Sequence, residues 1–360
     1  MRIRLPRLPG FPRLGLALLP LCAALAGPQT VAQAADCPGH PDAIGTSRTL
    51  VVDPLDHRKI GTMSYSETLP LADHEVVLTF DDGPLAPYTN RVLEILASEC
   101  VKATYFIVGV MAKSNPELVR RIAEQGHTIG THSMNHPLPF RRLGLDRAIP
   151  QVEGGIAATA IALGDAGKLA PFFRFPGFGK TEPVEAYAMS QGLMIWGADM
   201  PADDWRKISA KEVVKRAIQR LEAKGKGILL LHDIHERTVE ALPVILKELK
   251  ERGFRIVHVV PSSVERPASP TVVADWKPYS RSMAARQIAA LPKAAITDVS
   301  SAAVPAPPER TADETGSDKR RHHSRHFVEL ERHRLSRRHH HHHPYAWHDR
   351  YAPPDRHASR

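Results

Sequence analysis

The sequence predicts an α/β fold built on a mostly parallel sheet. From Val76 to about Val260, short β-rich runs alternate with amphipathic helical stretches, an order typical of strands joined by helical crossovers. About seven such units fit a closed or nearly closed barrel, and an open doubly wound sheet fits the same periodicity. After Val260 few apolar residues remain to be buried, so a disordered C-terminal tail is expected there.

Each expected strand is a short run rich in β-forming residues. These runs are Val76–Phe80, Ala103–Val108, Thr128–Gly130, Phe172–Phe175, Met194–Trp196, Ile228–Leu231 and Arg255–Val259. Amphipathic helices are expected between them, at Tyr88–Ser98, Pro116–Gln125, Ala210–Ala223 and Glu240–Glu251. Pro116 favours a helix start, while Gly126 and Gly253 favour helix ends, so these residues agree with the expected bounds.

The N-terminus has the pattern of a secretory signal. Residues 1–34 contain a basic region, the apolar stretch Leu14–Leu25 and the small-residue site Ala32-Gln33-Ala34, which together predict cleavage and a secreted or periplasmic protein. The apolar stretch is shorter than the roughly 20 residues that span a bilayer, which leaves an uncleaved or interfacial anchor as the alternative. Residues 35–73 then form an N-terminal extension, 74–262 the main domain, and 263–360 the tail.

The net charge of +9 belongs to the ends of the chain. Residues 1–34 hold four arginines and no acid, and residues 319–360 hold ten arginines and one lysine against four acids. The middle is nearly neutral, so no nucleic-acid partner is expected. The tail, rich in Pro and Ala and then in Arg and His, is expected to contact anionic envelope polymers, and the protein is expected to be a monomer. Once the signal is removed, Cys37 and Cys100 remain, and one disulfide or two free thiols are both compatible with the sequence.

Five polar segments stand out, and four of them follow expected strands, whose carboxyl ends meet at one end of a parallel sheet. In the first, Thr79–Pro84, two adjacent acids can divide labour between binding a cation and accepting a proton, although such a segment also fits a plain turn. The second, His132–Pro137, places two histidines four residues apart. If this stretch is helical, both face one side and can reach one metal ion, and a carboxylate from another strand end completes the set.

The other three segments carry an arginine, several acids and a further histidine. Arg174–Gly179 offers a guanidinium that can hold a carboxylate and a loop that turns sharply. Asp199–Trp205 joins acids to an aromatic ring suited to a sugar face, or equally to a core tryptophan. Ile228–Asp233 is an apolar strand ending in His232, which is placed to act as a general acid or base, or to bond loop backbone.

Together these segments resemble the polysaccharide deacetylases of carbohydrate esterase family 4, whose shared domain is called the NodB homology domain. The resemblance covers roughly Val76 to Val260 with all five segments in the family order, and Thr79–Pro84 and His132–Pro137 are its most specific motifs. It implies a distorted (β/α) barrel. It also implies a divalent metal cofactor, zinc foremost, with cobalt or another divalent ion in some members.

The first three motifs match the residues that form the metal site and the catalytic base in the family. By resemblance, Asp81 matches the catalytic base and Asp82 the acidic metal ligand. His132 and His136 match the two histidine ligands. Arg174 matches the residue that orients the base.

The remaining motifs match the residues that form the general acid and the substrate pocket in the family. His232 matches the general acid, and Leu230 matches the wall of the pocket for the acetyl methyl group. Asp204 resembles the acid that tunes His232, with Trp205 beside it, although the same segment holds other candidate acids. The family commonly has an aromatic residue where this chain has Gly177, whose backbone N–H is then expected to stabilise the oxyanion.

The resemblance implies a hydrolase that removes N-acetyl groups from an N-acetylglucosamine-containing glycan of the chitooligosaccharide or peptidoglycan type. Metal-activated water would attack the acetyl carbon, with an aspartate as base and a histidine as acid. An O-acetyl esterase acting on an exopolysaccharide is the alternative enzyme, and an inactive glycan-binding protein of the cell wall is the alternative from another class. Glycan binding alone needs neither a base nor an acid, which favours an enzyme.

Overall fold

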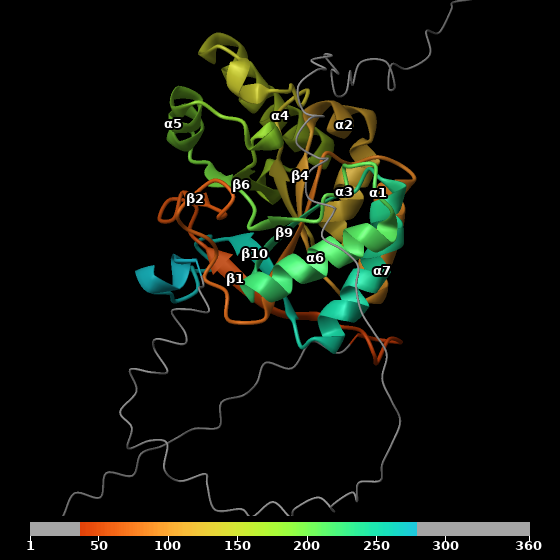
Figure 1. The fold of residues 1–360 in the computed structure, drawn as a ribbon. Helices are drawn as coiled ribbons and strands as arrows, with labels where there is room; N and C mark the ends of the chain where they lie inside the picture. The colour runs from red at the N-terminus through yellow and green to blue at the C-terminus, as the bar shows by residue number, and fades with distance from the viewer. Residues whose placement is uncertain (1–36, 279–360) are drawn as a thin grey trace, which may run out of the picture. The chain divides into compact units, whose positions relative to one another are not determined.

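The computed structural model describes residues 37–278, in which ten strands form one parallel sheet (Figure 1). The strands are β1 (Thr46–Val52), β2 (Lys59–Ile60), β3 (Glu75–Asp81), β4 (Thr104–Ile107), β5 (Thr128–Thr131), β6 (Leu169–Phe173), β7 (Met194–Trp196), β8 (Met200–Pro201), β9 (Gly227–His232) and β10 (Arg255–Pro261). Every pairing among them is parallel. The predicted α/β class with a mostly parallel sheet is therefore confirmed.

The order of the strands makes the sheet a distorted barrel rather than an open sheet. Strands β9, β3, β4, β5, β6 and β7 pair in that order, and β8 pairs with the free side of β9. Only residues 197–199 separate β7 from β8, so the chain passes directly from the β7 end of this series to β8 beside β9, while β2 pairs with the outer side of β7. The seven predicted strands correspond to β3, β4, β5, β6, β7, β9 and β10, and the structure adds the short β2 and β8 and the edge strand β1.

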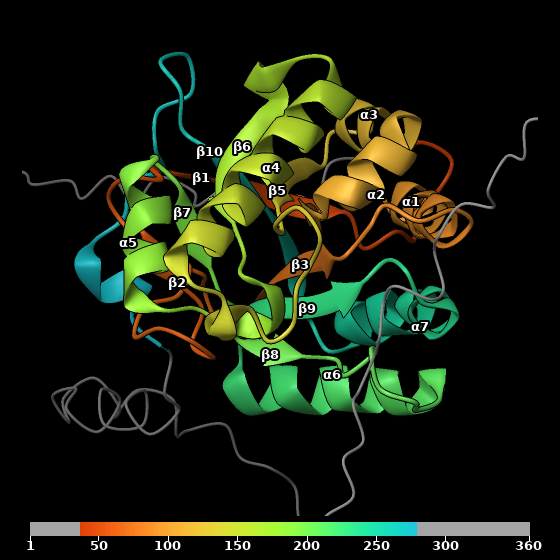
Figure 2. The same ribbon diagram turned by 90° about the horizontal axis from the view of Figure 1, so that it is seen from above.

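Seven α-helices within residues 37–278 surround these strands, as Figure 2 shows. They are α1 (Tyr88–Ser98), α2 (Gly109–Ser114), α3 (Pro116–Glu124), α4 (Leu145–Leu163), α5 (Glu182–Ser190), α6 (Ala210–Lys224) and α7 (Glu236–Glu251). Short 3-10 turns occur at Phe140–Arg142, Ala166–Lys168, Pro176–Phe178 and Val273–Trp276. The sequence indicated α1, α3, α6 and α7. It did not indicate α2, α4 or α5.

Strand β3 shows how the sequence divides its side chains between the two sides of the sheet. Val76, Leu78 and Phe80 pack in the main apolar cluster, which α1, α6 and α7 help to form. Val77 belongs to a second cluster, together with residues of several other strands. Successive side chains of a strand point to opposite faces. The alternation therefore places Asp81 on the side of Val77, away from the helices.

Residues at both ends of the described chain pack against the sheet. Strand β1 pairs with β10, and Cys37 forms a disulfide with Cys100, the pairing that the sequence left open. Residues beyond the expected boundary at residue 262 also pack here: the backbone N–H of Ser269 donates to the Val51 carbonyl at 2.9 Å, and Trp276 is only 3% exposed. The Trp276 side chain packs in the second apolar cluster, and its carbonyl accepts from the Thr68 N–H at 2.8 Å. The expected signal peptide and most of the expected tail lie outside the described residues.

Within residues 37–278, no helix combines the length and the hydropathy needed to cross a bilayer.

Candidate metal and catalytic site

The site begins where β3 and β9 end side by side. The two strands run in parallel register from Val76 opposite Gly227 to Asp81 opposite His232. Asp81 and His232 thus share the end of one strand pair although 150 positions separate them in the sequence. Both side chains are buried, at 3% and 8% exposure.

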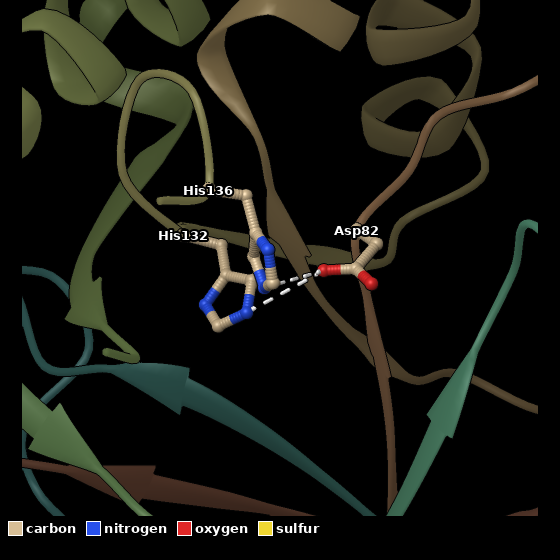
Figure 3. A group of neighbouring side chains, drawn as sticks. All are labelled: Asp82, His132 and His136. Carbon is tan, nitrogen blue, oxygen red and sulfur yellow. Dashed lines mark ion pairs between the residues drawn. The ribbon is translucent and has the colours of Figure 1, made fainter. Parts of the chain in front are cut away.

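Asp82 and the two histidines of the second motif converge just beyond this pair (Figure 3). The Asp82 Oδ1 atom lies 3.5 Å from His132 Nε2 and 3.2 Å from His136 Nε2. One ligand atom from each of the three residues lies within 4.8 Å of the others. Asp82 Oδ1 is buried and accepts no hydrogen bond among the described residues. Two imidazoles and a carboxylate are a donor set for a divalent ion such as zinc, so these residues fit the expected cofactor.

The helical conformation considered for His132–His136 does not occur, because these residues form a loop. Ser133 and His136 have φ angles of +68° and +50°, which a continuous helix excludes. The His136 N–H donates to Ser133 Oγ at 3.1 Å, which folds the loop back on itself. The two rings meet through this turn, with centroids 4.9 Å apart, and not through helical spacing.

Backbone contact fixes the orientation of the His132 ring. Its Nδ1 lies 2.6 Å from the Arg174 carbonyl oxygen, which can only accept, so Nδ1 carries the proton and Nε2 presents a lone pair toward Asp82. Burial lowers the pKa of His132 to about 4, even though the nearby Asp81 carboxylate acts to raise it. A neutral ring with a free Nε2 is the form that coordinates a cation.

Arg174 holds Asp81 from the other side. Its guanidinium is fully buried and donates to Asp81 Oδ1 at 2.6 Å, to Thr79 Oγ1 at 2.9 Å and to the Gly197 carbonyl at 2.7 Å. The group lies over the Phe106 ring, 4.1 Å from its centroid. These contacts leave Asp81 Oδ2 facing the histidines, 3.6 Å from His132 Nε2.

Asp204 holds His232 in a comparable way. Asp204 Oδ1 lies 2.8 Å from His232 Nδ1, while Oδ2 accepts from the His232 backbone N–H and from Thr238 Oγ1, both at 2.7 Å. His232 Nε2 is thereby directed to the site, 3.9 Å from Asp82 Oδ2. Burial alone would lower the pKa of His232, but the charge and hydrogen bond of Asp204 outweigh it and raise that pKa to about 10.

Two other acids of the fourth segment serve different contacts. Asp203 Oδ2 pairs with Arg216 at 2.7 Å and Arg220 at 2.9 Å on α6. Asp199 accepts from the backbone N–H of Ile228 at 2.8 Å and from Thr68 Oγ1 at 2.6 Å. Of the three acids, Asp204 is therefore the one that contacts His232.

Of the three expected substrate-contacting residues, Leu230 and Trp205 lie near His232 and Gly177 lies near Leu138. Leu230, two positions before His232 on β9, is 4% exposed. The half-buried Trp205 ring meets the His232 ring edge-on, with centroids 5.5 Å apart. Gly177 is exposed with φ +56°, and a Cβ placed on it would lie 3.0 Å from Leu138 Cδ2, in the loop that follows His136.

Sequence reasoning missed several residues that support the site. Thr79 precedes the acid pair and accepts from Arg174, and Thr238 on α7 donates to Asp204. His235 lies beside His232, with ring centroids 6.1 Å apart. Thr79 stands within the first motif and could have been noticed there. The sequence carries no signal for Thr238, since its role depends on where α7 packs.

Comparison with known proteins identifies similar sequences and structures. A family model described as polysaccharide deacetylase matches residues 69–196. A peptidoglycan-N-acetylglucosamine deacetylase of Bacillus cereus is 32% identical over 196 residues, which cover 53% of this chain and 89% of that protein. The enzyme of the same name from Listeria monocytogenes, PgdA, is 33% identical over 51% of this chain, but the match covers only 38% of that longer protein.

A solved structure shares the fold. The peptidoglycan deacetylase Bd3279 of Bdellovibrio bacteriovorus is 32% identical, with a TM-score of 0.54, over 61% of this chain and 60% of that one. The matched family model, the near-complete coverage of the Bacillus cereus relative and the shared fold all point to one group. The chain belongs to the polysaccharide deacetylase family.

Proposed function

We propose that the protein is a metal-dependent hydrolase that removes N-acetyl groups from an N-acetylglucosamine-containing glycan of the chitooligosaccharide or peptidoglycan type. One observation carries this proposal: a buried acid and a buried histidine, each held by its own partner, flank a cluster of metal ligands. Asp81 is held by Arg174 and His232 by Asp204, at 2.6 and 2.8 Å. A site that only bound a glycan would need neither pair.

Asp82, His132 and His136 would hold the divalent ion, zinc in the first place. When bound, such an ion lowers the pKa of a coordinated water toward about 7 and polarises the amide carbonyl. Asp81 Oδ2, which faces the ligand cluster, would take a proton from the attacking water as its oxygen bonds to the acetyl carbon. The Gly177 N–H would donate to the oxyanion.

His232 would complete the reaction by protonating the leaving amine. Its Nδ1 is occupied by Asp204, so Nε2 is the atom that would deliver the proton as the carbon–nitrogen bond breaks. The pKa near 10 keeps this ring protonated at neutral pH, as a general acid requires. Acetate and a free amino sugar result. Leu230 and Trp205 would line the space for the acetyl methyl group and the sugar.

We also propose that the protein acts outside the cytoplasm, in the periplasm or as a secreted enzyme. The signal pattern in residues 1–34 and the Cys37–Cys100 disulfide support this location, because disulfides persist in oxidising compartments. Its substrate would then be an envelope or extracellular glycan.

Acetate release by the purified full chain tests the function. The panel contains a chitooligosaccharide, peptidoglycan and an O-acetylated polysaccharide, each assayed before and after chelation and after zinc is restored. We expect zinc-dependent release from an N-acetylated glycan. Release from the O-acetylated polymer alone would favour an esterase, and release from none would favour a glycan-binding protein.

Metal content tests the ligand assignment. His132→Ala removes one of three ligands, so the variant should hold one equivalent less metal than the wild type and lose activity. The histidine-rich tail is identical in the two proteins, so its own metal cancels in the difference. Equal metal content would contradict the assignment.

A further inference from the structure

We infer that Gly155, in the interior of α4, sets the metal affinity of the site by letting this helix lie directly against the backbone of the loop that carries His132 and His136. This inference rests on the proposed metal site. It assigns a positioning role to a residue that contacts neither metal nor substrate.

The loop is clamped between two helices. On one side, the N–H groups of Gly109 and Val110, at the start of α2, donate to the carbonyls of Ser133 and Met134, both at 2.9 Å. On the other side, the Met134 N–H donates to the Gln151 carbonyl of α4 at 2.8 Å. The segment between the two histidines is therefore fixed by α2 and α4 rather than by the histidines themselves.

A second bond from α4 reinforces the clamp. The Asn135 N–H donates to Gln151 Oε1 at 2.9 Å, so the same glutamine binds two successive residues of the loop. The next residue is His136, whose own N–H returns to Ser133 Oγ. The position of the second histidine thus depends on how closely α4 approaches Ser133 and Met134.

Gly155 sets that approach. A Cβ atom built on it would lie 2.7 Å from the carbonyl carbon of Ser133, 2.8 Å from its oxygen and 3.0 Å from its Cα. All three are backbone atoms, so no side-chain rotation can relieve the contact. Helix α4 is itself packed through Ala158 and Thr159, which are 3% and 0% exposed. We therefore expect the loop, rather than the helix, to move.

Movement of the loop would alter the spacing of the two histidines. His132 is anchored at one end, since its Nδ1 bonds the Arg174 carbonyl at 2.6 Å. His136 has its Nε2 3.2 Å from Asp82 and follows Ser133 through the turn. Zinc requires ligand distances near 2.0–2.2 Å, held within about 0.2 Å, so a shift of one ligand relative to the other weakens binding.

Gly154 provides a matched control on the same helix. The three atoms nearest to a Cβ placed there all belong to the Met134 side chain: Cβ and Cγ at 3.3 Å and Sδ at 3.5 Å. These contacts are longer than those at Gly155, and the Met134 Cγ and Sδ atoms can move by rotation of the side chain. Both glycines lie inside α4, so alanine raises helix propensity equally at the two positions. The two variants therefore differ in whether the added methyl meets backbone or side chain.

The experiment measures zinc affinity by competition with a chromophoric chelator, for the full-length wild type, Gly155→Ala and Gly154→Ala. His132→Ala is measured in parallel and defines the binding due to the histidine-rich tail. We expect Gly155→Ala to weaken the domain site about 10- to 100-fold, the range for loss of a supporting contact. Gly154→Ala should stay within about threefold, and both metal-free variants should unfold cooperatively on heating.

If His132→Ala loses the zinc site but Gly155→Ala binds zinc with the affinity of the wild type, the inference is overturned. If the wild type and His132→Ala bind zinc equally, the proposed metal site itself fails. If Gly155→Ala does not fold, Gln151→Met decides, because it removes the acceptor of the Asn135 N–H without adding an atom at the contact. Weaker binding by that variant supports positioning by α4, and unchanged binding overturns it.

Discussion

Replacing Asp204 with asparagine tests how the site keeps His232, the proposed general acid, protonated. Asp204 is fully buried and bonds His232 at both Nδ1 and the backbone N–H. The substitution preserves size but removes the negative charge. The largest of the charges that oppose burial is then gone, and only Asp82 and Asp81 still act to raise the pKa of His232. The pKa of the ring should therefore fall from about 10 toward its usual value near 6.5.

The size of the effect follows from the protonated fraction. At pH 8 a group with a pKa of about 10 is about 99% protonated, and one with the ordinary histidine pKa of about 6.5 is roughly 3% protonated. The part of the rate that depends on protonated His232 should therefore fall about 30-fold at pH 8, and further at higher pH. A cation held by the proposed ligands would lower the pKa of His232 in both proteins, so the quantity to compare is the shift in pKa between them.

The assay is kcat/KM for acetate release from pH 5 to 10, with metal content measured on the same samples. The alkaline limb of the Asp204→Asn profile should move toward acid by two units or more, and activity should approach the wild type near pH 5. Asp203→Asn is the matched control, because Asp203 pairs with Arg216 and Arg220 instead, and its profile should keep the wild-type shape. A loss that is equal at every pH would refute the reasoning, since it would show damage other than a shifted proton.

Two further predictions concern the base and a buried histidine remote from the site. Asp81→Asn keeps the side-chain volume but cannot accept a proton, so turnover should fall about 10²–10⁴-fold while metal content stays unchanged; loss of metal would contradict its role as base. Burial lowers the pKa of His127 to about 3, so its contribution to stability is present above pH 6.5 and is lost as the pH falls toward 3. His127→Gln can still accept a hydrogen bond from the Ala103 N–H and does not titrate. Between pH 7 and pH 4, the free energy of unfolding in urea should therefore fall by roughly 3 kcal/mol less in this variant than in the wild type. An equal decrease in the two proteins would contradict this prediction.

The ends of the strands were predictable from the sequence because burial leaves a strong local pattern. An apolar run that stops at Asp81 or at His232 identifies a strand end without any knowledge of the fold. That local pattern does not show which strands pair with one another. The register that sets Asp81 beside His232 arises between strands far apart in the chain, and no local feature of either strand encodes it.

The choice between Asp203 and Asp204 shows a second limit. The two acids are adjacent, so composition and spacing treat them alike. In the fold their side chains serve different partners, one facing the arginines of α6 and the other His232. Asp203 adopts a φ of +60°, a backbone turn that the sequence does not predict. Which acid meets the histidine depends on that turn.

Helix α4 shows why a residue needed for close packing can make its own helix hard to predict from the sequence. It contains Pro150 and the pair Gly154 and Gly155, all poor helix formers, so local helix propensity is low although the buried positions recur at helical spacing. The helix exists because tertiary packing outweighs local propensity. Yet a glycine is what the contact with Ser133 requires, since any larger residue would meet backbone at 2.7 Å. The residue that lowers the helix propensity is the one that lets the helix reach the loop, so local sequence signals are least informative where close packing holds the loop of the proposed metal ligands.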